Sequence, residues 1–544
     1  MMKVSRYILA AALAVCAIVS CERWPDRQVF EGSGLGAVSK YYELPETATD
    51  TLVDVIATMK YDITHNSDWL STPATSQGRD GFRITCEGNT GVARIATIIL
   101  AIEQTHHYDT ITVRQNGTTA MTILNGSEDG SAKIALNSDV EDYQLSVKYF
   151  GDVAGWISAP EVVDGEIAFT YMKNEDVLPR LASIVISYKD AAGVELSHGF
   201  DILQYNNSDT HMPVADSVVD LTEGGKWANC YILNESAETV YSVDVKHVSG
   251  KSVSSAIRMA EVLWETVEGT VNNVVFDPVD GKLYFRKKEG AKGNSVVALK
   301  DNTGKILWSY HLWAPGEELK DVVIGGVTFM DRNIGAMTSA APSGTENASV
   351  GMHYQWGRKD PFPPAASLST ANGVQSAVYP ADAIKYTPAN EGHPGKPLNF
   401  TIENPSTYIW GSGSTGNEDW SQIQNDNYWG AEKTDYDPCP YGYVVPTKDQ
   451  LQAVTSIWND SANATKGKNI ACDGGVNYWV KAGWYRRSYH ATSNLANVGN
   501  NGYYWTSTAV AYTGSVRGAY ASEGGSLKAS VRRWGGNVRC VKVN

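Results

Sequence analysis

The sequence predicts a mostly β protein with several domains, and three observations support this. The chain has 544 residues, enough for about three to five domains. It contains 50 Gly, 29 Tyr and 16 Trp, and its apolar residues rarely recur at helical spacing. Two segments of similar length also repeat the same short motifs, which is typical of tandem domains. We therefore expect a row of Ig-like β-sandwiches followed by a different C-terminal domain.

The overall charge excludes one class of partner. Lys and Arg number 45 against 60 Asp and Glu, which gives a formal net charge of −15 and a pI near 5.2. This acidity argues against a nucleic-acid partner. It also gives no sign of a basic patch for membrane surfaces.

The first twenty residues predict export. Two basic residues precede an apolar run that ends at Ser20 and is too short to span a bilayer stably. The run is followed by Cys21, and residues 18–21 resemble a bacterial lipoprotein signal. The resemblance implies that residues 1–20 are removed and that Cys21 carries acyl chains, each buried CH₂ contributing about 0.8 kcal/mol to anchoring. The alternative is an ordinary cleaved secretion signal.

Residues 21–36 are expected to be a tether, because glycines gather near their end. The lipid anchor implies an outer-membrane location. We expect the protein to face the cell exterior, with the periplasmic face as the alternative.

An internal repeat covers residues 37–117 and 118–207. The matching motifs begin around Trp69 and Trp156, at Arg94 and Arg180, and end at Gln115 and Gln204, with offsets of 87, 86 and 89 residues. Each copy shows short alternating strands separated by turns, as expected of a small β-sandwich. The copies resemble the BACON family, found in surface and secreted proteins of gut bacteria and often placed before carbohydrate-active domains. We interpret both tryptophans as core residues, with sugar binding as the alternative.

Residues 214–316 predict a third sandwich. Trp227 to Leu233 is an apolar strand, whereas residues 256–264 fit either a short helix or a strand. Asp280-Gly281 suits a tight hairpin turn, and residues 302–304 suit a second one. The segment that ends at Trp313 resembles the β-sandwiches of fimbrillin-like surface proteins.

Residues 320–544 form the last predicted domain, organised around residues 437–451. These read as a turn, a short strand and a helix start, where Thr447 and Gln450 can form a capping box. The motifs at 439–447, 504–508 and 535–541 resemble the FISUMP-type domains of fimbrial-tip-like proteins from Bacteroidetes. The resemblance implies an α+β, C-type-lectin-like fold.

The cysteines of an exported protein sit in an oxidising setting. Cys439 and Cys540 are expected to form a disulfide, closing a loop of about 100 residues worth roughly 4–5 kcal/mol in the chain-entropy model. Cys86 and Cys230 lie in strand-like runs and are expected to be small buried hydrophobes. Cys472 stands alone.

The sequence shows little sign of catalysis, and we expect no enzyme, cofactor or metal. P-loop, zinc and nucleophile-elbow motifs are missing. Formylglycine-generating enzymes resemble this fold but use a cysteine pair that this chain lacks. The triplets at 458–460 and 403–405 look like those of calcium-dependent lectins, but we interpret them as coincidence because calcium needs six to eight converging oxygens.

A dense set of aromatic and amide residues remains in loop-like contexts of the last domain, partly within a long insertion at 363–432. Rings stack on the apolar face of sugars, and amides or carboxylates bind their hydroxyls. The predicted ligand-binding residues are Trp410, Trp420, Asn425, Asp426, Tyr428, Trp429, Trp484, Tyr485 and Trp534. The alternative is that half or more of the rings are core.

We therefore expect a non-catalytic cell-surface lipoprotein that acts in adhesion or binds glycan, mucin or a host surface protein. Its modules would form a stalk of three sandwiches with the recognition domain at the tip. The alternative is a structural role as the anchor or tip subunit of a fimbria-like assembly, with fimbrial subunits as partners.

Overall fold

The computed structural model describes the chain from residue 34 to residue 543 with several gaps. The described residues are 34–77, 81–136, 142–151, 153–189, 195–206, 217–245, 256–369, 372–387, 395–410, 419–458, 466–486, 495–513, 516–523 and 525–543. The predicted signal, Cys21 and most of the tether lie outside them. The described part is mostly β, as the sequence predicted.

The first sandwich has a five-stranded sheet in the order β2-β10-β9-β5-β7, a three-stranded sheet in the order β3-β8-β6, and a β1–β4 pair. Side chains alternate between a buried and an outer face, so that one face of each sheet supplies the core. The strands are β1 (Leu35–Ala37), β2 (Tyr41–Leu44), β3 (Thr49–Val53), β4 (Val55–Ala57), β5 (Lys60–His65), β6 (Leu70–Ser71), β7 (Thr75–Gln77), β8 (Phe82–Cys86), β9 (Arg94–Ile102) and β10 (His107–Gln115), with a 3₁₀ turn at Glu103–Thr105.

The second sandwich has sheets in the orders β11-β17-β16-β13 and β12-β15-β14. Its strands are β11 (Thr122–Asn125), β12 (Gly130–Ala135), β13 (Gln144–Phe150), β14 (Glu161–Val163), β15 (Glu166–Tyr171), β16 (Arg180–Lys189) and β17 (Glu195–Tyr205).

The third sandwich has sheets in the orders β18-β20-β23-β22 and β19-β25-β24-β21. Its strands are β18 (Val218–Asp220), β19 (Cys230–Ile232), β20 (Thr239–Asp244), β21 (Met259–Glu265), β22 (Val271–Asp277), β23 (Lys282–Lys287), β24 (Gly293–Lys300) and β25 (Ile306–Ala314). Both expected hairpins form, between β22 and β23 and between β24 and β25. The undecided segment at 256–264 is mostly strand β21, and the apolar run that starts at Trp227 forms only the short strand β19.

All three sandwiches share one feature of strand order. An early strand runs parallel to the last strand of the same sandwich, as β2 with β10, β11 with β17, and β19 with β25. The third unit, which has no repeat motif in common with the first two, therefore closes its sheet in the same way.

The repeated residues form the same cluster in the first two sandwiches. The guanidinium of Arg94 lies over the ring of Trp69, 4.6 Å from its centroid, and Arg94 Nε donates to Gln115 Oε1 at 2.8 Å. The equivalent distances in the second copy are 4.9 Å over Trp156 and 3.0 Å to Gln204 Oε1. Trp156 is fully buried and Trp69 packs at the edge of its core. These contacts favour the interpretation of both tryptophans as core residues.

The C-terminal domain has two main sheets, in the orders β26-β27-β41-β32 and β29-β36-β35-β40-β37-β38-β39, with β28 beside β40. Its elements are β26 (Asp321–Ile324), β27 (Val327–Met330), β28 (His353–Gln355), β29 (Asn372–Gly373), β30 (Lys385–Tyr386), α2 (Leu398–Glu403), β31 (Thr407–Tyr408), β32 (Tyr443–Val444), α3 (Lys448–Thr455), β33 (Gly467–Cys472), β34 (Gly475–Val480), β35 (Trp484–Tyr485), β36 (Leu495–Ala496), β37 (Tyr503–Thr513), β38 (Val516–Glu523), β39 (Ser526–Val531), β40 (Gly535–Asn537) and β41 (Val541–Lys542). The capping box predicted at Thr447 and Gln450 is present at the start of α3.

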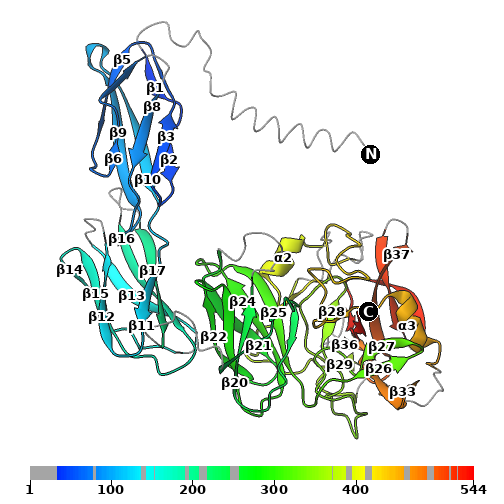
Figure 1. Cartoon of the computed structure of the whole chain (residues 1–544). Helices are drawn as coiled ribbons and strands as arrows, with labels where there is room; N and C mark the ends of the chain where they lie inside the picture. The colour runs from blue at the N-terminus through cyan, green and yellow to red at the C-terminus, as the bar shows by residue number, and fades with distance from the viewer. Residues whose placement is uncertain are drawn as a thin grey trace.

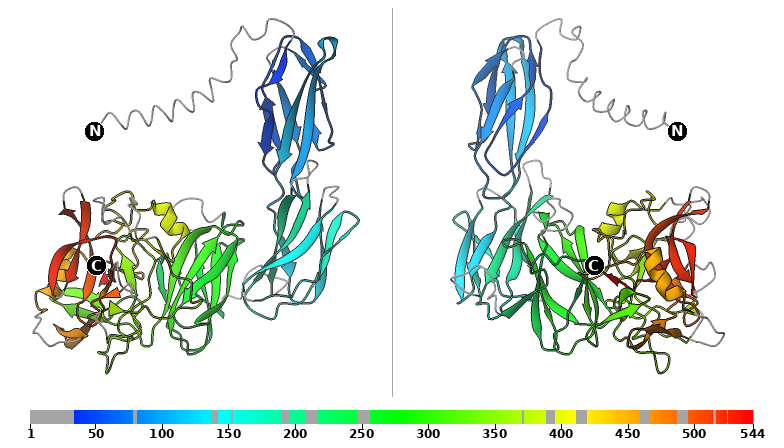
Figure 2. Two further views of the ribbon diagram at one scale, coloured as in Figure 1. Left: turned by 180° about the vertical axis from the view of Figure 1, so that it is seen from behind. Right: turned by 45° about the vertical axis from the view of Figure 1, so that its right-hand side comes forward.

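Figures 1 and 2 show the first two sandwiches stacked end to end, with the third beside the second and the C-terminal domain beyond it. The second and third sandwiches share an apolar cluster that includes Leu178, Tyr205 and Val275. Tyr205 also donates its hydroxyl to Asp277 Oδ2 at 2.7 Å across the joint. This buried contact fixes the bend of the chain.

The third sandwich and the C-terminal domain share one hydrophobic core. Trp264 and Trp313 from the third sandwich lie in the same cluster as Met330, Ile334 and Trp356 from the C-terminal domain. Both faces of the β19-β25-β24-β21 sheet are therefore covered, one by its own sandwich and one by the next domain. The third unit is thus part of the C-terminal body, whereas we expected a spacer that only displays it.

Candidate functional site

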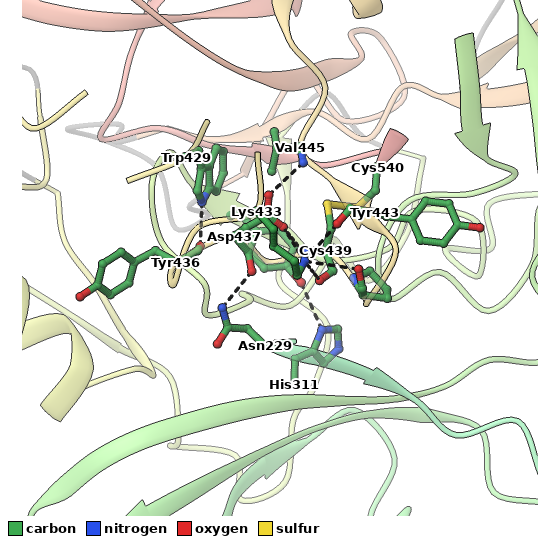
Figure 3. The surroundings of a disulfide bond; sticks show 12 residues. Asn229, His311, Trp429, Lys433, Tyr436, Asp437, Cys439, Tyr443, Val445 and Cys540 are labelled. Carbon is green, nitrogen blue, oxygen red and sulfur yellow. Dashed lines mark hydrogen bonds and ion pairs between the residues drawn. A yellow bond between two sulfur atoms is a disulfide. The ribbon is translucent and has the colours of Figure 1, made fainter. Parts of the chain in front are cut away.

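The disulfide expected between Cys439 and Cys540 is present, with a Cα–Cα distance of 6.0 Å and a sequence separation of 101 residues. Figure 3 shows the turn around it. Asp437 is fully buried, and its carboxylate accepts hydrogen bonds from the backbone N–H groups of Cys439 and Val445 at 2.8 and 3.0 Å. Lys433 Nζ pairs with Asp437 Oδ1 at 3.1 Å and donates to the carbonyl of Cys439 at 2.7 Å. The carboxylate of Asp437 and the ammonium of Lys433 thus both have structural partners.

The third sandwich holds the same turn from the other side. Asn229 Nδ2 donates to the carbonyls of Asp435 and Asp437 at 2.8 and 2.9 Å. Figure 3 shows Asn229 and His311 reaching toward the turn. His311 is buried, and its ring nitrogens lie 2.9 Å from Asn294 Oδ1 and 3.1 Å from the hydroxyl of Tyr354. Burial lowers the pKa of His311 to about 3, so the ring is neutral and joins the two domains as donor and acceptor.

A second polar contact joins the same two domains. Lys359 Nζ donates to Asp360 Oδ1 at 2.7 Å and to the carbonyl of Ser309 at 2.8 Å, and Ser309 Oγ donates to the same carboxylate oxygen at 2.6 Å. All three side chains are buried. Because their donors and acceptors are satisfied, we interpret this group as a domain contact.

The long insertion at 363–432 is less loop-like than expected. It contains β29, β30, α2 and β31 and contributes buried residues to two apolar clusters. Figure 1 shows α2 above the third sandwich, and Glu403 of α2 pairs with Lys305 of that sandwich at 2.8 Å. Part of the insertion therefore helps to dock the two domains. Residues 411–418 of the insertion lie outside the described residues.

Most of the nine predicted ligand-binding residues are buried. Six rings, those of Trp410, Trp420, Tyr428, Trp429, Trp484 and Tyr485, are at most 5% exposed. Trp356, a neighbour in the same core, lies 5.7 Å from Trp429 between ring centroids. These six rings agree with the alternative that they form core, because a buried face cannot stack on a sugar. Asn425, Asp426 and Trp534 keep partial exposure.

The turn between β39 and β40 organises these residues. Arg532 is fully buried, lies 3.9 Å from the ring centroid of Trp356, and pairs with both Asp419 and Asp426. Arg532 Nη1 also donates to the carbonyl of Asn425 at 3.2 Å. Burial raises the pKa of Asp419 to about 6 although Arg532 opposes this shift. Arg532 thus brings the loop carrying Asn425 and Asp426 to the turn.

Trp534 lies two residues beyond Arg532 in the same turn. Its ring is 6.1 Å from Trp484 and 6.0 Å from Tyr503, measured between centroids, and Arg486 lies 5.5 Å from it on a cation–π contact. We call Trp534, Arg486, Asn425 and Asp426 the Trp534 rim. The Trp534 ring contacts the Arg486 guanidinium, and Arg532 of the same turn holds the loop that carries the amide of Asn425 and the carboxylate of Asp426. Rings, amides and charged groups of this kind bind sugars or polar protein surfaces.

Sequence reasoning missed Arg486 and Arg532. The signal for Arg532 was the pair of arginines directly before Trp534, ahead of the motif at 535–541. The triplet at 458–460 lies just beyond α3. Trp458 is buried, and the other two residues lie outside the described part. Among the described residues, His, Cys, Asp and Glu do not gather in groups of three or more that could hold a metal ion.

Comparisons with known proteins add little to this picture. No family model and no curated protein matches the chain. Solved structures that match include a Bacteroides ovatus GH5 xyloglucanase at 17% identity and TM-score 0.15, covering 16% of this chain and 20% of the xyloglucanase. Titin Ig tandem domains A164–A165 match at 9% identity and TM-score 0.16, covering 32% of this chain and 98% of the titin fragment. An endo-fucoidan hydrolase of glycoside hydrolase family 107 matches at 10% identity and TM-score 0.14, covering 54% of this chain and 45% of the hydrolase.

These TM-scores are too low to support a functional inference, and the chain spans only about a fifth of the xyloglucanase. Within the described residues, the helices are too short or too polar to cross a bilayer.

Proposed function

We propose that this protein is a non-catalytic, lipid-anchored surface protein that binds glycan, mucin or a host surface protein through its C-terminal domain. The observation that carries the proposal is the Trp534 rim, where a partly exposed ring contacts Arg486 on a turn that Arg532 ties to the loop carrying Asn425 and Asp426. Rigid support matters because a preformed site loses little entropy when it binds. Lipidation of Cys21 and exposure on the outer membrane belong to the same proposal.

Two features support a C-type-lectin-like assignment for this domain. Strand β27 near its start pairs with β41 near its end, where Phe329 faces Val541. The Cys439–Cys540 disulfide then ties β41 to the turn before α3. The two ends are thus held together, and the loops between them are free to build a recognition surface.

The fimbrial alternative would need a groove that accepts a strand from another subunit. In each sandwich the place beside the last strand is taken by the chain's own β2, β11 or β19. This favours a single-chain adhesin over a donor-strand assembly.

The test is binding of the chain from residue 22 onward to glycan and mucin arrays, with Trp534→Ala as the variant. We expect the change to weaken binding about tenfold or more, because partly exposed Trp side chains are common hot spots. Tyr441→Ala is the matched control, since Tyr441 is an exposed ring of the same domain. Equal binding by wild type and Trp534→Ala, or an equal loss in Tyr441→Ala, would contradict the proposal.

A further inference from the structure

A hollow of about 480 Å³ lies between the second and third sandwiches, far along the chain from the Trp534 rim. Its walls come from the loop after β13, the segment between β15 and β16, and strand β22. This volume lies within the range of small-molecule sites, which commonly occur at domain interfaces.

The hollow is preformed because the joint around it is fixed. Arg286 of the third sandwich pairs with Asp176 of the second, and Leu178 packs with Val275 in the shared apolar cluster. Tyr205 and Asp277 add a buried hydrogen bond of 2.7 Å. Ligand binding would therefore lose no free energy to ordering the two domains relative to each other.

The lining has the two kinds of surface that a sugar requires. Phe150, Val153 and Met172 give an apolar side, and Met172 is 53% exposed. Asp129 and Glu175 give acceptors for hydroxyl groups. Charges of both signs line the hollow, where Lys173 pairs with Glu175 at 2.6 Å and Arg180 is also part of the lining, which favours a neutral polar ligand over an anion or a cation.

The fold of the second sandwich does not by itself require an apolar residue at position 172. Met172 in the second repeat and Glu87 in the first are equivalent positions. The backbone carbonyl of Met172 accepts hydrogen bonds from Arg180 at 2.7 Å and from Gln204 at 2.9 Å. The carbonyl of Glu87 accepts the matching bonds from Arg94 at 3.1 Å and from Gln115 at 2.9 Å. The first copy thus builds the same cluster with an exposed Glu where the second exposes Met. The hydrogen-bonded cluster therefore does not explain why an exposed apolar side chain stands at position 172.

The strand on the opposite wall is also irregular. The β22–β23 ladder breaks its register between Asn272 and Val275, and Asn273 has a left-handed φ of 48°. Bulges of this kind often change the direction of side chains beside binding sites. A residue other than glycine with a left-handed φ also costs conformational free energy, which the surrounding structure has to offset. Asn273 lines the hollow next to Asp176.

We propose that this hollow is a second binding site, which takes the end of a neutral oligosaccharide independently of the C-terminal domain. The apolar side would face the CH face of one sugar ring, and the acids and Asn273 would bind its hydroxyls. The chain would then contact an extended glycan at two separated points.

The test uses the whole chain from residue 22 onward with ¹³C-labelled methionine methyl groups, titrated with cellotetraose, mannotetraose and galactotetraose. We expect the Met172 signal to shift and saturate with at least one of the three. Met59 is the internal control, because it is 40% exposed on the first sandwich and outside the hollow. A Met172 signal that stays still with all three, or that moves only as much as Met59, would overturn the proposal.

A pair of variants gives a second readout by calorimetric titration. Met172→Glu installs the residue of the first repeat and should weaken binding of the active oligosaccharide about tenfold. Val163→Glu places the same charge on another exposed apolar position of the same sandwich and should leave binding unchanged. Unchanged binding in Met172→Glu would refute the site. Trp534→Ala should leave the Met172 shift intact, so the two sites can fail separately.

Discussion

Two buried arginines of the C-terminal body, Arg532 and Arg539, are matched to partners. Arg532 pairs with two acids and lies against Trp356, and Arg539 lies 4.2 Å from the ring centroid of Trp479. Burial lowers the pKa of Arg539 to about 10, but the guanidinium remains charged at neutral pH. A buried charge of this kind is costly to leave unpaired. These arginines therefore hold loops in place rather than offer a binding surface.

His311 should make the C-terminal body sensitive to acid. Its pKa is about 3 in the folded chain against about 6.5 when unfolded, so below pH 6.5 the unfolded state binds the extra proton. Stability is then lost as pH falls from 6.5 toward 3, by about 1.4 kcal/mol per pH unit. We expect His311→Gln to reduce the pH slope of unfolding free energy between pH 4 and 6 by about this amount.

Chemical denaturation at several pH values would measure the slope. Part of it should persist in His311→Gln, because burial also lowers the pKa of His353, to about 4. The control is His107→Gln in the first sandwich. A slope in His311→Gln as steep as that of wild type would contradict the expectation.

At the scale of elements, short local signals were reliable. The capping box of α3 and the hairpins of the third sandwich appear where the sequence placed them. Each depends on residues close in sequence, so the physical cause is local. The insertion at 363–432 was harder, because its short elements are stabilised by packing on segments that are distant in sequence.

The disulfide is expected to stabilise the C-terminal body. Replacing Cys439 and Cys540 by Ser releases a loop with a sequence separation of 101 residues, and the chain-entropy model sets the loss at roughly 4–5 kcal/mol as an upper figure. Denaturant unfolding with and without reductant would measure it. Cys472→Ala is the control, since that thiol is unpaired and only partly buried. Unfolding that reductant leaves unchanged would argue against a stabilising role.

On the scale of the whole molecule, the chain has two parts: a C-terminal body, made of the third sandwich and the C-terminal domain, and the first two sandwiches. The third sandwich and the C-terminal domain share a core, and the second sandwich is fixed to the third by an apolar cluster and the Tyr205–Asp277 bond. Figures 1 and 2 show that the first two sandwiches project from this body. We expected a stalk of three sandwiches with the recognition domain at its tip, whereas the third sandwich shares a core with that domain.

This architecture predicts which fragments fold. A fragment of residues 217–543 keeps the shared core and should melt in one transition without binding a hydrophobic dye. A fragment of residues 320–543 exposes the face that carries Met330 and Ile334, so it should melt at a lower temperature and bind the dye. Calorimetry and dye fluorescence would check both. Equal melting temperatures for the two fragments would contradict the shared core.

The sequence by itself determined the mostly β composition, the repeat, and the turns and caps, because each follows from residue spacing or local chemistry. The cysteine pair was expected from the motifs that flank Cys439 and Cys540, and the structure confirms it. Only the tertiary structure decided which aromatic rings are core and which face of the third sandwich is covered. Trp308 and Trp313 of β25 face opposite sides of one sheet, and both are buried. The second side is closed by segments distant in sequence, and alternation within a strand carries no information about such a partner.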